Sequence, residues 1–129
     1  MESSIFISKA DENFRAAQLC YTNGLYNACA NRAYYAMFQA AVGMLMTKGF
    51  VFEQKQHFDH AKVLAMFANE FINRKKVFQS KFKSHLYDAQ IIRGMADYEI
   101  RMISRKRAHR QLTKVKELTD AINQELQNA

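Results

Sequence analysis

The sequence has no proline and only four glycines among its 129 residues. Both residue types favour turns and interrupt helices, so their scarcity leaves few positions where the chain can form hairpins. The residues are 49% apolar, which allows a chain of this length to bury one sizeable core. We therefore expect an all-α protein that forms a single domain over residues 1–129.

Long apolar runs are also missing. The longest nearly apolar stretch, residues 33–46, spans 14 residues and contains Gln39, whereas a membrane-spanning helix needs about 20 residues. The N-terminal residues MESSIF do not have the basic segment and apolar core of a secretory signal. These features predict a cytoplasmic protein with no membrane partner.

Cysteine is scarce too, since Cys20 and Cys29 are the only two. They form no CxxC pair, and we expect them on apolar helix faces as reduced thiols rather than in a disulfide or a redox site. His57 and His60 are spaced for one helical face, but no cysteine or second histidine pair lies at zinc-binding spacing. The sequence therefore predicts no metal and no cofactor.

Positive charge is distributed unevenly along the chain. Residues 1–71 contain six Lys or Arg and six Asp or Glu, whereas residues 72–129 contain thirteen and six, which accounts for the whole net charge of +7. One-sided positive charge favours nucleic acid, because basic side chains neutralise phosphates and release counterions. A solvated helix face and an acidic protein partner are the alternatives. The candidate contacts to a nucleic-acid backbone are Arg101, Arg105, Arg107, Arg110 and Lys114.

Apolar residues recur at spacings of three and four in five segments, which predicts five helices. The expected helices span about residues 4–21, 25–48, 57–73, 78–98 and 104–127, with a loop at 50–56. Gly24 and Gly49 end the first two helices. This order predicts an antiparallel up-and-down bundle of four main helices plus a shorter one.

The second expected helix contains the run ANRAYYAMFQAA at residues 30–41, which is apolar on nearly every side. Such a helix lies in the middle of a bundle. Asn31 and Arg32 are its polar exceptions. Asn31 can form an interhelical hydrogen-bond ladder with Asn27 while Arg32 reaches an acidic group, or both can line a cleft. Of the adjacent tyrosines, one belongs in the core, and the other, Tyr35 in our assignment, contacts a partner or stacks on a base.

Arg93 continues the apolar stripe of the fourth expected helix, seven residues after Leu86 and four after Ala89. A guanidinium in this position must be paired or lie in a wet cleft. Asp97, four residues later, can form a structural ion pair with it. Alternatively, Arg93 binds a phosphate and Asp97 orients the guanidinium, while Gly94 permits another backbone to approach closely.

Three motifs together resemble the HEPN family of small helical domains. They are NRAYYAMF at residues 31–38, His60 followed by Val63, Phe67 and Phe71, and RGMADY at residues 93–98, in the order found in one HEPN subfamily. The resemblance implies a homodimer that is encoded beside a minimal nucleotidyltransferase. It also implies a toxin–antitoxin-like pair that acts on RNA, with Asn31, Arg32, Tyr35 and His60 at a cleft or partner contact.

The activity depends on a position where the chain departs from the family. HEPN ribonucleases resemble one another in an Arg that is followed, after four to six residues, by a His, and two such motifs meet across a dimer. Here the window after Arg93 contains Tyr98, Glu99 and Ile100. The candidate catalytic residues are therefore Arg93, Asp97 and Tyr98, although a phenol with a pKa near 10 is a poor base at neutral pH.

Two functions are compatible with this pattern. The first is a HEPN toxin that binds RNA, cleaves it without a metal and is controlled by a cognate nucleotidyltransferase, with Tyr98 as the tyrosine that such a partner modifies in similar toxins. The second is a non-catalytic helical module that recruits or regulates a nucleotidyltransferase. The absence of a His after Arg93 favours the second.

Overall fold

The computed structural model describes residues 2–52 and 59–128, and these residues form helices and connections without a strand. The elements are α1 (Glu2–Thr22), α2 (Tyr26–Thr47), α3 (His60–Phe67), the π-helical segment η1 (Ala68–Arg74), α4 (Lys81–Tyr98) and α5 (Arg105–Gln127). The prediction of an all-α fold is confirmed for this part of the chain. None of its helices has both the length and the apolar character needed to cross a bilayer.

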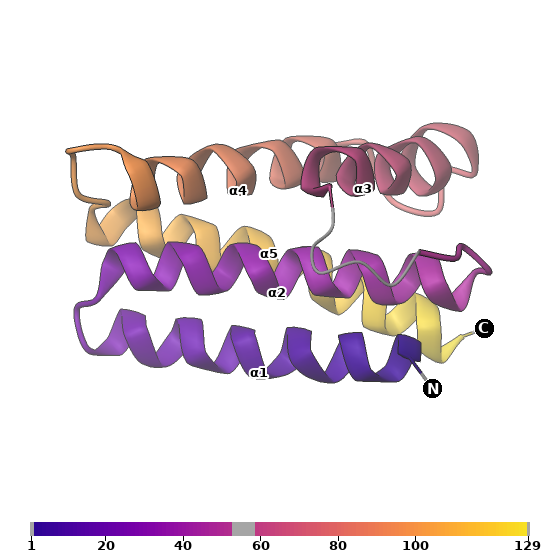
Figure 1. Ribbon diagram of the computed structural model, residues 1–129, viewed down its shortest axis with the longest axis horizontal. Coiled ribbons are helices and arrows are strands. Elements are labelled where there is room, and N and C mark those ends of the chain that lie inside the picture. The colour runs from indigo at the N-terminus through magenta and orange to yellow at the C-terminus, as the bar shows by residue number, and fades with distance from the viewer. Residues whose placement is uncertain (1, 53–58, 129) are drawn as a thin grey trace.

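Helix α2 is the element on which the others pack. Figure 1 shows α1 beside α2 and running in the opposite direction, with α4 and α3 on another side of α2 and α5 behind it. Each of α1, α3, α4 and α5 contacts α2, and α1 and α4 also contact α5. The layout fits the antiparallel bundle expected from the sequence.

The burial of α2 follows from its composition. Almost every residue from Cys29 to Leu45 is buried, including Tyr34 at 1% exposure. Within this stretch, the partly exposed residues are Asn31, Arg32, Tyr35 and Gln39. The prediction of a central second helix is confirmed, and the polar groups of α2 must find their partners on neighbouring helices.

The helix ends follow local chemistry. Asp59 caps α3 by accepting a hydrogen bond from the Lys62 backbone N–H at 3.1 Å, and Ser104 caps α5 by accepting one from Arg107 at 3.1 Å. The segment expected as one helix over 57–73 begins at His60 in the described residues, with His57 outside them. Its second half is the wider η1, where the backbone N–H of Lys75 donates to Glu70.

Both cysteines are free thiols, as expected. Cys29 is fully buried in α2, and Cys20 is partly exposed on α1. Burial raises the pKa of the Cys29 thiol to about 11. Cys29 is therefore neutral at physiological pH and acts as a small apolar core residue.

Helix α1 approaches α2 closely at Gly43, where there is no room for a larger side chain. A Cβ at this position would lie 2.6 Å from Ile7 Cδ1 and 3.2 Å from the Ser3 carbonyl oxygen. We expect Gly43→Ala to lower the free energy of unfolding by about 1 to 2 kcal/mol through overpacking. Gly94→Ala in α4 is the matched control, because its Cβ would meet nothing within 4 Å. Denaturant unfolding should show no loss for the control, and equal stability of the two variants would contradict the close contact.

Candidate functional site

Arg93 lies on the face of α4 that packs against α2. Its guanidinium carbon is 5.0 Å from the centroid of the Tyr34 ring and 5.7 Å from that of the Tyr35 ring. Its side chain is 21% exposed. The faces of the two rings attract the cation, and this attraction holds it at the edge of the core.

The hydrogen-bonding capacity of Arg93 is only partly used. Nη2 donates to the Tyr35 hydroxyl at 3.4 Å, and the buried Nε has no hydrogen-bond partner among the described residues. The Asp97 carboxylate lies 3.7 Å from Nε, which is ion-pair distance but too long for a hydrogen bond. The expected Arg93–Asp97 pair is therefore present, but it leaves donors of the guanidinium available to another anion.

The hydrogen bonds to the Asp97 carboxylate come from α2 and not from Arg93. The Asn31 amide nitrogen donates to both carboxylate oxygens, at 3.1 and 3.0 Å. Asn27, one turn earlier, accepts from the Ile103 backbone N–H at 2.8 Å. The expected ladder of Asn27 and Asn31 is confirmed, and it joins α2 to the end of α4 and to the connection that follows.

The expectation that Arg32 reaches an acidic group is wrong. Its guanidinium donates to the side-chain oxygen Oδ1 of Asn31 and, at 3.0 Å, to Oδ1 of Asn13 on α1. Asn13 in turn donates to Gln39 at 2.7 Å. Because α1 presents an amide rather than a carboxylate at this point, Arg32 has no acidic side chain as a direct partner among the described residues.

Positive charge therefore exceeds negative charge in this part of the bundle. Arg32 lies 5.1 Å from the centroid of the Tyr35 ring, so Tyr35 contacts both guanidiniums. Asp97 is the carboxylate of the described network, against the two cations Arg32 and Arg93. Such an excess, together with free donors, is suited to an anionic group such as a phosphate.

His60 joins the same group of residues from the first turn of α3. Its Nδ1 shares a 2.8 Å hydrogen bond with the Tyr34 hydroxyl, and its ring stacks on Phe38 at 4.1 Å between centroids. Burial raises the pKa of Tyr34 to about 12, so this phenol stays neutral at physiological pH. Tyr34 thus contacts both His60 and Arg93, which are 33 residues apart in the sequence.

The last candidate catalytic residue, Tyr98, lies at the end of α4 and outside the network. It is 80% exposed and forms no hydrogen bond or ring contact with another described residue. Arg101 is exposed nearby in the sequence, 3.8 Å from Glu99. Ile100 and Met102 are exposed as well, so this end of the bundle combines aromatic, apolar and basic side chains.

The basic residues of α5 have different environments. Arg105 donates from Nε to the Tyr21 hydroxyl at 3.2 Å, and the Arg107 guanidinium contacts the Met95 sulfur at 3.6 Å. Lys114 forms an ion pair with Asp88 at 2.9 Å. Arg110 has no acidic partner in the described part of the chain. No carboxylate among the described residues therefore pairs with Arg105, Arg107 or Arg110. The charge of Lys114 is neutralised by Asp88.

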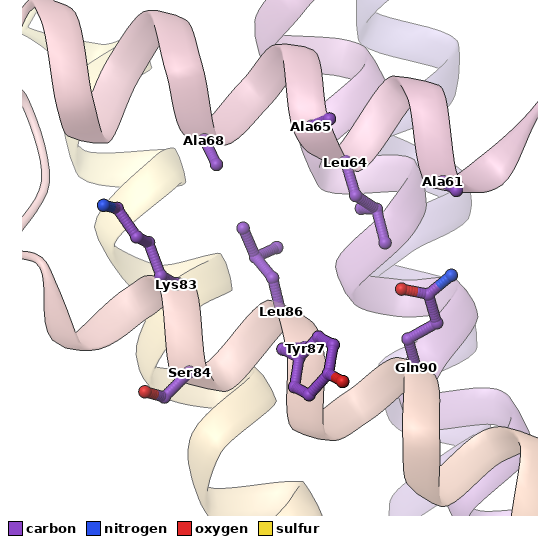
Figure 2. Close-up of a pocket in the computed structure, with 9 residues that line it drawn as sticks. All are labelled: Ala61, Leu64, Ala65, Ala68, Lys83, Ser84, Leu86, Tyr87 and Gln90. Carbon is purple, nitrogen blue, oxygen red and sulfur yellow. The ribbon is translucent and has the colours of Figure 1, made fainter.

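A hollow of about 480 Å³ lies between α3 and α4, and none of the residues of the Arg93 network lines it. Figure 2 shows its lining, which comprises Ala61, Leu64, Ala65, Ala68, Lys83, Ser84, Leu86, Tyr87 and Gln90. Its surface is mostly apolar, which suits side chains of another protein better than a phosphate. Among the described residues, no three His, Cys, Asp or Glu side chains are grouped closely enough to hold a metal ion.

A family model described as HEPN domain matches residues 3–125. The chain belongs to the HEPN family. The match includes α2, α3 and α4, which carry the residues around Arg93.

This HEPN chain is similar to proteins of Methanocaldococcus jannaschii and Pyrococcus horikoshii. It is 31% identical to "Putative toxin MJ0142" of Methanocaldococcus jannaschii over 93 residues, which is 72% of this chain and 59% of the relative. It is 39% identical to "Putative toxin MJ0605" of the same organism over 72 residues, 56% of this chain and 50% of the relative. It is 31% identical to "UPF0332 protein PH1297" of Pyrococcus horikoshii over 98 residues, 76% and 61% of the two chains. The chain thus spans between half and three fifths of these relatives' length.

Proposed function

We propose that this protein is the toxin of a toxin–antitoxin-like pair, that it acts on RNA as a homodimer, and that a cognate nucleotidyltransferase controls it. The observation that carries the proposal is that only some of the hydrogen-bond donors of the Arg93 guanidinium have a partner, in a part of the bundle with excess positive charge. Membership of the HEPN family and the similarity to two proteins named as toxins support it.

The proposed reaction is metal-independent RNA cleavage. The ribose 2′-oxygen attacks the adjacent phosphorus, the bond to the 5′-oxygen breaks, and a 2′,3′-cyclic phosphate and a 5′-hydroxyl result. Arg93 stabilises the negative charge that develops on the phosphate oxygens. Asp97 accepts the 2′-hydroxyl proton and Tyr98 donates a proton to the leaving oxygen. These roles place the base, the acid and the cation within the last two turns of α4.

The homodimer is proposed on the exposed stripe of α4. Tyr87 and Ile91 lie four residues apart, which places them on one helix face. Their side chains are 65% and 44% exposed. A second copy that packs its own α4 here would bury both stripes around a two-fold axis and bring two Arg93 residues toward one cleft.

The second candidate function is a non-catalytic module that binds a nucleotidyltransferase. The observation that favours it is the absence of a histidine in the window after Arg93, combined with the separation of Tyr98 from the Arg93 network. In this case the Arg93–Asp97 pair serves only the packing of α4 on α2.

Arg93→Ala separates the two functions. We expect it to abolish growth inhibition and RNA cleavage, the latter by at least about 100-fold as for other transition-state donors, with a modest loss of RNA binding. The assay uses purified protein and labelled RNA in EDTA. Arg15→Ala is the matched control, because Arg15 also pairs with an Asp four residues away, but on the exposed face of α1. A wild-type protein that neither cleaves RNA nor impairs growth would favour the non-catalytic module.

The dimer is tested by Ile91→Asp. A buried aspartate in the proposed interface is unfavourable, so sedimentation should change from twice the chain mass to the mass of one chain at micromolar concentration. Leu19→Asp on α1, where Leu19 is 66% exposed, is the control and should leave the dimer intact. A wild-type monomer would contradict the proposed assembly.

Control by a nucleotidyltransferase is tested at Tyr98. The exposed phenol oxygen would attack the α-phosphate of a nucleoside triphosphate, form a phosphodiester and release pyrophosphate. Co-expression with the cognate transferase should add one nucleotide mass per chain, and Tyr98→Phe should abolish that addition. Tyr87→Phe is the control, since Tyr87 is also an exposed tyrosine of α4. Modification that persists in Tyr98→Phe would contradict this assignment.

A further inference from the structure

A small polar hollow lies between α4 and α5, and it shares no residue with the Arg93 network. Its volume is about 140 Å³. The lining residues are Asp88, Ile91, Ile92, Arg107, Arg110, Gln111 and Lys114.

Gln111 is the unusual member of this lining. The residue is only 5% exposed, and its side-chain oxygen is buried without a hydrogen-bond partner in the described part of the chain. A buried carboxamide oxygen in this state is costly, because it has lost water and gained no donor. Because Gln111 also lines the hollow, a bound group with a hydroxyl or N–H could supply the missing donor.

The charges in the hollow favour an anion. Lys114 and Asp88 form an ion pair at 2.9 Å, so their charges cancel. Neither Arg107 nor Arg110 has a carboxylate within ion-pair distance among the described residues, and Arg107 contacts only the Met95 sulfur, at 3.6 Å. Two unpaired guanidiniums at the edge of a small hollow match the geometry of a phosphate, whose oxygens accept from the planar fork.

We propose that this hollow binds one phosphate and the neighbouring ribose of an RNA chain, with Arg107 and Arg110 on the phosphate and the 2′-hydroxyl donating to Gln111 Oε1. The proposal rests on the proposed function, because it assumes that RNA binds, and it adds the residue that distinguishes RNA from DNA. DNA has the phosphate but lacks the hydroxyl. The side chain of Ile92 supplies an apolar wall for the sugar carbons.

The test measures binding of a 12-nucleotide single-stranded RNA and of DNA with the same base order, with the integrity of the RNA checked on a gel. Wild-type protein should prefer RNA by about tenfold, the contribution of one buried hydrogen bond. Gln111→Met keeps the side-chain volume. It should remove the preference, so that RNA and DNA bind with about equal affinity, without changing the affinity for DNA. Gln124→Met on the exposed surface of α5 is the control and should keep the preference.

Three further measurements make the test specific. Arg107→Gln with Arg110→Gln should weaken RNA and DNA binding alike, so the ratio of the two affinities should persist. Single 2′-deoxy substitutions along the RNA, measured with wild-type protein, should show a loss of about tenfold at a small number of positions. That result does not depend on how any variant folds. Adenosine monophosphate carries the same phosphate and ribose, and it should displace the RNA only at a concentration far above that of the RNA.

The outcomes separate this inference from the proposed function. Equal affinity of wild-type protein for RNA and DNA, or an unchanged preference in folded Gln111→Met, would overturn the inference and leave RNA binding in place. Displacement of the RNA by micromolar adenosine monophosphate would assign the hollow to a free nucleotide. Failure to bind either polymer would overturn the proposed action on RNA and this inference with it.

Discussion

The placement of a permanent positive charge at the edge of an apolar core is the constraint on which the site depends. Arg93 cannot lose its proton, so α4 can pack against α2 only if α2 offers the guanidinium a favourable surface. The faces of Tyr34 and Tyr35 supply that surface at 5.0 and 5.7 Å. Aromatic rings attract the cation without using its hydrogen-bond donors, and this is why Arg93 is held in place while donors of its terminal nitrogens stay unused.

The amide network explains why Asp97 does not use those donors. Asn31 binds both oxygens of the carboxylate, and Arg32 binds the oxygen of Asn31, so the carboxylate is held from α2 rather than from Arg93. The network continues through Asn13 to α1. Three helices of the bundle therefore determine the position of one carboxylate, and helix α2 serves both as the core of the fold and as the support of the site.

Much of the fold could be predicted from the sequence, because helical periodicity and helix ends are local properties. The five helices, the burial of α2 and the unusual position of Arg93 all follow from residue spacing, and the motif around His60 indicated its place near the site. The η1 segment was not predicted, since a π-helix requires only a change in hydrogen-bond register that leaves the apolar pattern intact.

Side-chain partners across the bundle were harder to predict. The sequence indicated a polar role for Arg32 but not its amide partner on α1, and it did not indicate that Tyr34 connects His60 with Arg93. Gln111 was not recognised either, because a glutamine on a basic helix resembles any solvated residue until its burial is known. Such contacts depend on the rotation of each helix about its axis. The spacing of apolar residues predicts which broad face of the helix is buried, but not the exact rotation.

The availability of the terminal Arg93 donors is the central claim, and nuclear magnetic resonance of the arginine side chains tests it most directly. The Nη–H resonances of Arg93, assigned by comparison with Arg93→Lys, are recorded before and after addition of an RNA whose 2′-hydroxyls are methylated to prevent cleavage. A downfield shift of an Nη–H proton together with slower exchange with water is the predicted result, because this N–H would then donate to a phosphate. Nη–H resonances that do not respond while the RNA is bound would contradict the account.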